Sequence, residues 1–337
     1  MSAVDQPPRV VVLGLGGTIA MTGQGGVVPS LSAEQLVAAV PGPDEIGVDL
    51  DVATFRTKPG ASLTFADLTD LAEVVRQRLA DGAAGVVVTQ GTDTIEETAY
   101  LLDLLHAHPR PVVVTGAMRN PTLAGADGPA NLLAAIQTAV SPHTTDLGCL
   151  VVFADEIHAA ARVRKIHSTS TAAFASPVGG PLGYLVEGAP VLVSRPVRRY
   201  SVTGRLHGQP RVGLYVATLG DDGGLLPSFA ADLDGLVVAG FGVGHVPASW
   251  VPALAEVAAR IPVVLASRTG AGPVLSTTYG FPGSERDLQD RGLIRAGLLD
   301  GYKARILLYC LLATDTDRAG IRAAFATAGG IDALPAL

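Results

Sequence analysis

The chain has 337 residues, two cysteines and a net charge of −7 at neutral pH. Hydrophobic residues make up 48% and charged residues only 16%, which excludes global disorder and favours a compact protein with large buried sheets. Basic residues form no run, so the sequence offers no electrostatic footprint for nucleic acid or for an anionic membrane surface. Two domains are expected, because a domain commonly has about 100–200 residues.

The cysteines and the N-terminal segment indicate a cytoplasmic protein. Cys149 and Cys310 each lie inside an apolar run and are expected to be buried thiols rather than zinc ligands or a disulfide pair. The first residues, Met-Ser-Ala-Val-Asp-Gln-Pro-Pro-Arg, lack the basic and apolar regions of a secretory signal. No apolar segment approaches the ~20 residues of a membrane span.

The strongest local pattern is an apolar run over residues 10–13 that leads into Gly14, Gly16, Gly17 and then Thr18. A run without polar breaks predicts a strand buried on both faces, as in parallel sheets. The glycines permit positive φ angles and a close approach of a ligand to the backbone. Thr18 is therefore the candidate nucleophile, and the alternative is a tight turn in which its hydroxyl only satisfies backbone groups.

A dinucleotide-binding loop also begins with Gly-x-Gly after a strand. Here Ile19 stands where that pattern needs Gly or Ala, and residues 21–29 contain three more glycines and a proline instead of opening a helix. Nucleotide binding is therefore disfavoured.

Strand-like and helical stretches then alternate. Ser32 is the expected N-cap of a short helix. Further strands are predicted at 48–55, 85–90, 111–115 and 149–153, and helices at 68–79 and 94–105. Because helical crossovers are right-handed, the strands should be parallel, with their ends on the edge where open α/β sheets bind ligands.

Small polar residues follow two of these strands, in Gly91-Thr92-Asp93 and in Gly116-Ala117. Thr94 and Glu97 fit a capping box, which leaves Thr92 and Asp93 unused and equally consistent with a polar-ligand site.

The strand at 149–153 is expected to lead into a polar loop that carries Asp155, Glu156, His158 and Lys165. Near Asp93 in a water-poor cleft, Lys165 would stay paired or become a neutral proton acceptor, and the alternative is a solvated basic turn. No pattern assigns a role to His158.

The domain boundary is expected within residues 178–209, which are rich in Pro, Gly and Arg and are predicted to be irregular. The N-terminal catalytic domain would then cover 1–190, a linker 191–210, and a smaller α/β domain 211–337. In that smaller domain, strand-like runs begin at residues 211, 235 and 261, and a helix is predicted over 302–312.

Five motifs together resemble the bacterial L-asparaginase/glutaminase family of the threonine-nucleophile type: Gly-Gly-Thr18-Ile-Ala, Gly91-Thr92-Asp93-Thr-x-Glu-Glu-Thr-Ala-Tyr100, Gly116-Ala-Met-Arg119, Asp127-Gly-Pro129 and Lys165. The resemblance spans nearly the whole chain. It implies an α/β fold in which a larger N-terminal domain has a mainly parallel, flavodoxin- or Rossmann-like sheet and a smaller C-terminal domain is also α/β. It further implies that Thr18 attacks the side-chain amide of L-asparagine, releases ammonia and leaves a β-aspartyl ester for water to hydrolyse, without metal or cofactor.

The resemblance also implies roles for other residues. Thr92 and Lys165 would form a second hydroxyl–amine pair, with Asp93 orienting the lysine and binding the substrate α-amino group. Backbone amides near Thr92 and Ala117 would face the reacting carbonyl. Ser62 is the candidate ligand for the α-carboxylate, because Gly60-Ala61 stands where the family has Ser-Gln or Ser-Ser. The family usually has a tyrosine just after the nucleophile, and residues 21–30 contain none.

The family assembles as a tetramer of intimate dimers, which implies a homo-oligomer here. Tyr279 and Glu285 from a neighbouring subunit are candidates to complete the pocket, and a surface loop is the alternative. Other functions left open are a dual-specificity glutaminase-asparaginase, an amidase component of an amidotransferase, and a non-catalytic small-ligand-binding protein. The set Thr18, Thr92, Asp93 and Lys165 argues against the last, since binding alone would not require it.

Overall fold

The computed structural model describes residues 6–22, 28–29, 31–40 and 47–331, with residues 18, 21–22 and 28–29 described by their backbone alone. The chain divides between Val197 and Arg198 into two compact units. Within the described residues, the first unit contains an eight-stranded sheet and the second a four-stranded sheet. The predicted fold class, a larger α/β domain followed by a smaller one, is confirmed.

The large sheet is mainly parallel. Its strands are β1 (Arg9–Gly14), β4 (Asp49–Thr54), β5 (Gly85–Thr89), β6 (Val112–Thr115), β7 (Cys149–Phe153), β8 (Glu156–Ala159), β11 (Gly183–Val186) and β12 (Ala189–Leu192). They lie in the order β12-β11-β8-β7-β6-β5-β1-β4. Strands β4, β1, β5, β6 and β7 are parallel to one another, whereas β8, β11 and β12 add antiparallel pairs at one side.

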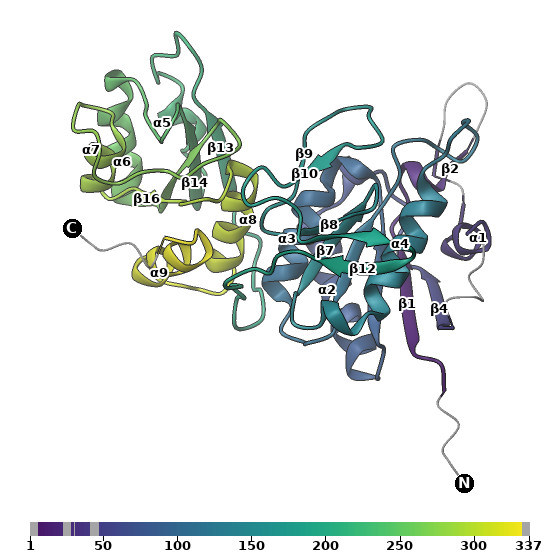
Figure 1. Ribbon diagram of the computed structural model, residues 1–337. Helices are drawn as coiled ribbons and strands as arrows, with labels where there is room; N and C mark the ends of the chain where they lie inside the picture. Colours follow the sequence, from purple (N-terminus) through teal and green to yellow (C-terminus); the bar gives the residue numbers. More distant parts are fainter. Residues whose placement is uncertain (1–5, 23–27, 30, 41–46, 332–337) are drawn as a thin grey trace. The chain divides into compact units, whose positions relative to one another are not determined.

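Helices cover both faces of this sheet (Figure 1). They are α1 (Ala33–Ala38), α2 (Phe65–Ala80), α3 (Ile95–Leu105) and α4 (Gly128–Val140). Side chains of α1 and α4 share one hydrophobic cluster with Val10 and Val12 of β1, while α2 and α3 pack on the opposite face. Since successive strand residues point to opposite faces, the apolar run of β1 is buried on both sides, as predicted. Ser32 caps α1 in a capping box with Gln35, which confirms that prediction as well.

Two segments predicted to be loop or irregular are strands. The expected polar loop after β7 is the hairpin partner β8, reached through Ala154 and Asp155 at φ 50° and 62°. Neither turn residue is a glycine, so the sequence carries no hairpin signal there. The expected irregular stretch contains the β11–β12 hairpin, turned by Glu187 and Gly188 at φ 50° and 78°. Pro190 is tolerated because β12 is an edge strand.

The second unit is built on a parallel sheet in the order β13-β14-β15-β16. These strands are β13 (Val212–Val216), β14 (Gly235–Gly240), β15 (Val263–Ser267) and β16 (Ile294–Arg295). Its helices are α5 (Leu226–Phe229), α6 (Val251–Arg260), α7 (Glu285–Asp290), α8 (Gly301–Leu312) and α9 (Arg318–Ala328). Helix α8 starts one residue before the predicted 302–312. In the described part of the chain, every helix lacks the combined length and apolar character of a transmembrane span.

Candidate active site

The loops that follow the parallel strands leave from one edge of the large sheet. Gly14 at the end of β1 is in register with Thr54 of β4 and Thr89 of β5, and Thr89 is in register with Thr115 of β6. Three short 3-10 turns follow these strands: η1 (Thr18–Ala20), η3 (Gly60–Ser62) and η4 (Thr92–Thr94). The prediction that the small polar strand ends share one edge is therefore confirmed.

Glycines bring these three turns into direct contact. A Cβ added to Gly17, which has φ +85°, would lie 2.0 Å from the Gly91 nitrogen. A Cβ on Gly91 would lie 3.1 Å from the nitrogen of Gly60. Backbones can approach this closely only where no side chain intervenes. The turn that contains Thr18 is thus packed against the turn that contains Thr92.

The polar centre of this edge is a cluster of Thr92, Asp93 and Lys165. The Lys165 Nζ donates to Thr92 Oγ1 at 2.9 Å and to Asp93 Oδ1 at 2.8 Å. Thr92 is buried and the Lys165 side chain is 15% exposed, whereas the Asp93 side chain is 67% exposed. Because the lysine has these partners, it is not the solvated basic turn that was the alternative. The arrangement can hold a hydroxyl and an amine ready for proton transfer.

Lys165 reaches this cluster from β9 (Arg164–Lys165), which pairs with β10 (Phe174–Ala175). Its backbone amide donates to Glu96 Oε1 at 3.2 Å. Glu96 lies in the first turn of α3 and is buried. Glu96 is not among the residues predicted for the site, although it stands in the acidic pair after Thr94, of which only Glu97 has a predicted role.

The predicted capping role of Thr94 is wrong. Its side chain makes no cap hydrogen bond to α3, and its hydroxyl instead donates to the Gly60 carbonyl at 3.1 Å. The side-chain amide of Gln90 donates through Nε2 to Thr94 Oγ1 and to the Gly91 carbonyl. Tertiary contact prevails here because the glycine packing brings the Gly60 carbonyl within reach of the Thr94 hydroxyl, in addition to the bond which that carbonyl accepts from the Leu63 amide at 3.2 Å.

Asp127 organises the turn after β6. Its carboxylate accepts the amide protons of Met118 and Arg119 at 3.0 and 2.8 Å, and Asn131 Nδ2 at 3.2 Å. The same Asn131 amide donates to the Gly116 carbonyl at 3.0 Å. This network fixes the backbone on both sides of Ala117, which is itself fully buried.

Asp67 organises the turn that precedes η3. Its buried carboxylate accepts from Lys58 Nζ at 2.8 Å, from Arg56 Nε at 3.2 Å and from the Thr64 hydroxyl at 2.8 Å. The Lys58 ammonium is the main reason that the pKa of the Asp67 carboxyl lies well below its usual range. Ser62, the predicted ligand for the substrate carboxylate, is the last residue of η3 and is exposed.

Thr18 is placed by its backbone in η1, directly after Gly17. The predicted action of its hydroxyl concerns a side chain that the structure does not describe, so it stays a prediction. Residues 21–30, where the sequence has no tyrosine, also lie outside the residues whose side chains are described.

Tyr279 and Glu285 lie in the second unit, where they differ in exposure. Glu285 is fully buried, and its carboxylate accepts the amide protons of Thr278 and Tyr279 at 3.1 and 2.9 Å and lies 3.1 Å from His245 Nε2. Tyr279 is 43% exposed, and its ring packs edge-on against the His245 imidazole. Glu285 therefore holds the turn that presents Tyr279.

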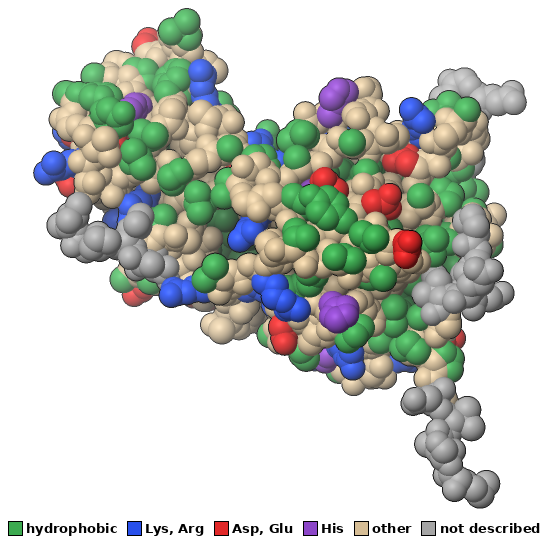
Figure 2. All heavy atoms as spheres, viewed as in Figure 1, with side chains coloured by type: hydrophobic (Ala, Val, Ile, Leu, Met, Phe, Trp, Pro, Cys, Tyr) green, Lys and Arg blue, Asp and Glu red, His purple; other side chains and the backbone are tan. Residues whose placement is uncertain are grey.

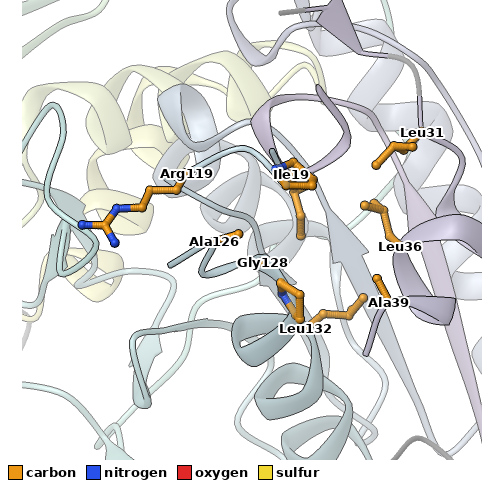
Figure 3. Close-up of a pocket in the computed structure, with 10 residues that line it drawn as sticks. Ile19, Leu31, Leu36, Ala39, Arg119, Ala126, Gly128 and Leu132 are labelled. Carbon is orange, nitrogen blue, oxygen red and sulfur yellow. The ribbon is translucent and has the colours of Figure 1, made fainter. Parts of the chain in front are cut away.

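An apolar cavity of about 50 Å³ lies between η1, α1 and the start of α4. Its lining includes Ile19, Leu36 and Leu132, and Figure 3 shows the Arg119 guanidinium group pointing away from them. Such a lining offers little to a charged amino acid, so the Thr92 cluster is the better candidate site.

The described residues contain no group of three or more His, Cys, Asp or Glu side chains placed to hold a metal ion. On the face shown in Figure 2, basic and acidic side chains are interspersed. That face has no continuous basic surface for a polyanion.

Family models match both units, as "Asparaginase, N-terminal" over residues 9–198 and as "Glutaminase/Asparaginase C-terminal domain" over residues 211–325. The chain belongs to the asparaginase family. It is therefore an enzyme, a hydrolase, as the resemblance implied.

Individual asparaginase relatives match the chain over nearly their whole length. A probable L-asparaginase of Deinococcus radiodurans is 37% identical, over 94% of this chain and 97% of the relative. A glutaminase-asparaginase of Pseudomonas aeruginosa is 32% identical, over 89% of this chain and 84% of the relative. The crystal structure of a probable cytoplasmic L-asparaginase from Campylobacter jejuni has a TM-score of 0.85 at 30% identity, and the match covers 94% of this chain and 99% of that protein.

Proposed function

We propose that the chain hydrolyses the side-chain amide of L-asparagine to L-aspartate and ammonia through an acyl-enzyme intermediate on Thr18. The observation that carries the proposal is the hydrogen-bonded Lys165, with Thr92 and Asp93 as its acceptors, next to the glycine contact that joins the Thr18 turn to the Thr92 turn. A threonine hydroxyl is a weak nucleophile and needs such a neighbouring proton acceptor.

The first half of the proposed reaction forms the ester. Thr18 Oγ1 attacks the amide carbon, its proton passes to the Lys165–Thr92 pair, and the amide nitrogen takes up a proton as it leaves as ammonia. Backbone amides at Thr92 and Ala117 donate to the oxyanion. The Asp127 network leaves the Ala117 amide outside its own hydrogen bonds, since it uses those of Met118 and Arg119.

The second half reverses these proton movements. Water gives its proton to the same pair and adds to the ester carbon, and Thr18 recovers its hydroxyl when L-aspartate leaves. Asp93 binds the substrate α-ammonium group, for which its largely exposed carboxylate is accessible. Ser62 binds the α-carboxylate from the exposed end of η3.

A preference for asparagine over glutamine is part of the proposal. The second candidate function is that of a dual-specificity glutaminase-asparaginase, which is the name of the Pseudomonas aeruginosa relative. An amidotransferase-type amidase component and a non-catalytic binding protein are supported less, because neither explains the whole set of Thr18, Thr92, Asp93 and Lys165.

The test is ammonia release by the purified protein. L-asparagine should be turned over much faster than L-glutamine, and Thr18→Ala should abolish turnover while the unfolding transition stays unchanged. With hydroxylamine present, the acyl-enzyme should yield the hydroxamate of aspartate. Equal rates on both substrates would contradict the preference, and an active Thr18→Ala variant would contradict the mechanism. Thr18→Ser, which keeps a hydroxyl, is the matched control.

We further propose a homo-oligomer, a dimer of dimers, in which Tyr279 enters the site of a neighbouring subunit and Glu285 positions it from behind. Mixing an inactive Thr18→Ala subunit with a Tyr279→Ala subunit tests this. Hybrid oligomers should regain activity, because one of their two sites combines an intact Thr18 with an intact Tyr279. Sedimentation as a monomer, or no recovery on mixing, would refute it.

The proposed location is the cytoplasm, as in the name of the Campylobacter jejuni protein. Cell fractionation with detection of ammonia release would test it.

A further inference from the structure

The strand pair that carries Lys165 is too short to hold itself in place. β9 and β10 pair through two residues each, Lys165 with Phe174 and Arg164 with Ala175. A two-stranded ladder is marginal on its own even at ordinary strand lengths. The position of the Lys165 side-chain nitrogen therefore depends on contacts between this hairpin and the rest of the unit.

A backbone bond, a ring contact and a side-chain bond join the hairpin to the unit. Lys165 is bonded to Glu96 through its amide, as described above, and the rings of Phe174 and Phe153 have centroids 4.8 Å apart. Ser176, which directly follows β10, has its Oγ 3.0 Å from Nδ1 of His158 on β8. This last contact ties the end of the hairpin to the large sheet.

His158 is fully buried, which decides its charge. Burial lowers its pKa from 6.5 to about 4, so the imidazole is neutral at neutral pH and carries one proton. Its Nε2 lies 3.3 Å from Glu156 Oε2 without forming a hydrogen bond. A proton on Nε2 faces that carboxylate more favourably than a lone pair does. Nδ1 then accepts the hydroxyl proton of Ser176.

We propose that His158 is a positioning residue for the reaction: through Ser176 it fixes β10, and through the β9–β10 pairing it fixes the Lys165 side-chain nitrogen against Thr92 and Asp93. The inference rests on the proposed amidase function, because that function gives Lys165 its part in catalysis. The 2.9 Å bond from Lys165 to Thr92 leaves little room, since a slide of β10 by about 1 Å would break it.

The residues Glu156, His158 and Ser176 are of the same types as the acid, histidine and serine of a hydrolase catalytic triad. A nucleophile needs access to substrate, however, and both Ser176 and His158 are buried. These three residues therefore hold the β9–β10 hairpin in place rather than attack a second substrate.

The lysines of this chain allow a direct test. There are three, Lys58, Lys165 and Lys303, so protein labelled with [ε-13C]lysine gives three side-chain NMR resonances, and Lys165→Arg assigns one of them. Ser176→Ala should shift or broaden the Lys165 resonance and leave the other two in place. Ser228→Ala is the matched control, because it removes a hydroxyl bonded to a backbone carbonyl, that of Leu225, within the second unit.

Substitutions at His158 separate its two nitrogens. The side-chain amide of His158→Asn reaches the place of Nδ1 and should keep the Ser176 contact, whereas that of His158→Gln reaches the place of Nε2 and should lose it. His158→Gln and Ser176→Ala should both lower kcat about tenfold, less than the ~100-fold that a 1 Å misplacement can cause. KM should stay within about twofold, and His158→Asn should retain most of the wild-type kcat.

An unchanged Lys165 resonance in folded Ser176→Ala would overturn the proposal, and so would equal changes in all three lysine signals, which would indicate a general structural role. The NMR measurement needs no substrate. A wild-type protein without amidase activity would therefore refute the proposed function and leave the positioning of Lys165 separately measurable.

Discussion

Substitution of Gly17 by alanine tests whether the glycine contact builds the site. Gly17 has φ +85°, and a Cβ there would lie 2.0 Å from the Gly91 nitrogen and 2.2 Å from its Cα. Ordinary contact begins at 3.4 Å, so the Thr18 and Thr92 turns must separate by about 1.4 Å. The left-handed backbone costs about 1–2 kcal/mol for alanine, and the overpacking adds about 1–3 kcal/mol.

We therefore expect Gly17→Ala to lose about 2–5 kcal/mol of unfolding free energy and about 100-fold in kcat, because the nucleophile moves away from the Lys165–Thr92 pair. Gly82→Ala is the matched control: Gly82 has φ +91° and nothing within 4 Å of an added Cβ, so it should lose only the backbone contribution and no activity. Urea unfolding and ammonia release measure the two effects. If Gly17→Ala matched Gly82→Ala in both, the role assigned to the glycine contact would be wrong.

Two further predictions concern buried titratable side chains. Asp67→Asn should destabilise the protein by about 2–3 kcal/mol, since it removes the carboxylate that pairs with both Arg56 and Lys58. The control Asp70→Asn, at a side chain that is 64% exposed, should lower the unfolding free energy by less than about 0.5 kcal/mol. Similar losses for the two variants in urea unfolding would contradict this prediction. His158, with its pKa lowered from 6.5 to about 4 in the folded state, binds a proton more readily when unfolded, so stability should fall by about 3 kcal/mol as the pH drops from about 6.5 to 4. Urea titrations across that range should show a shallower fall for His158→Asn, and parallel curves for the two proteins would exclude this source of acid sensitivity.

The Asp67 carboxyl acts in the same direction at lower pH. Because its pKa is lowered in the folded state, the stability that it contributes is present above its unfolded value of 3.8 and is lost as the pH falls below it. The His158 and Asp67 contributions are therefore separable by pH.

The sequence was sufficient to predict the strands and the edge at which they end. Unbroken apolar runs such as residues 10–13 encode burial on both faces, and a glycine followed by a threonine marks the turns after β1 and β5. It was not sufficient for β8 or for the β11–β12 hairpin. The turn before β8 uses Ala154 and Asp155 at positive φ, where the local pattern offers no glycine. Pro190 argues against a strand by local pattern, although an edge strand such as β12 tolerates it.

The sequence was also sufficient to predict which types of residue lie at the site, but not which of them are in contact. Thr94 fits a capping box by local spacing, yet it bonds to Gly60 because glycine packing brings that carbonyl near. Lys165 meets Glu96 and Thr92 from 69 and 73 residues away. No local periodicity can encode bonds over such separations, because they depend on the register between packed elements.

What the sequence alone determined was therefore the set of buried strands and the chemistry available at their ends. What only the tertiary structure decided was which groups meet: the turns of Gly17 and Gly91, the side-chain nitrogen of Lys165 with Thr92, and the imidazole of His158 with Ser176. Burial is a property of each side chain and its near neighbours in the chain, whereas a hydrogen bond between distant residues exists only after the elements that carry them have packed.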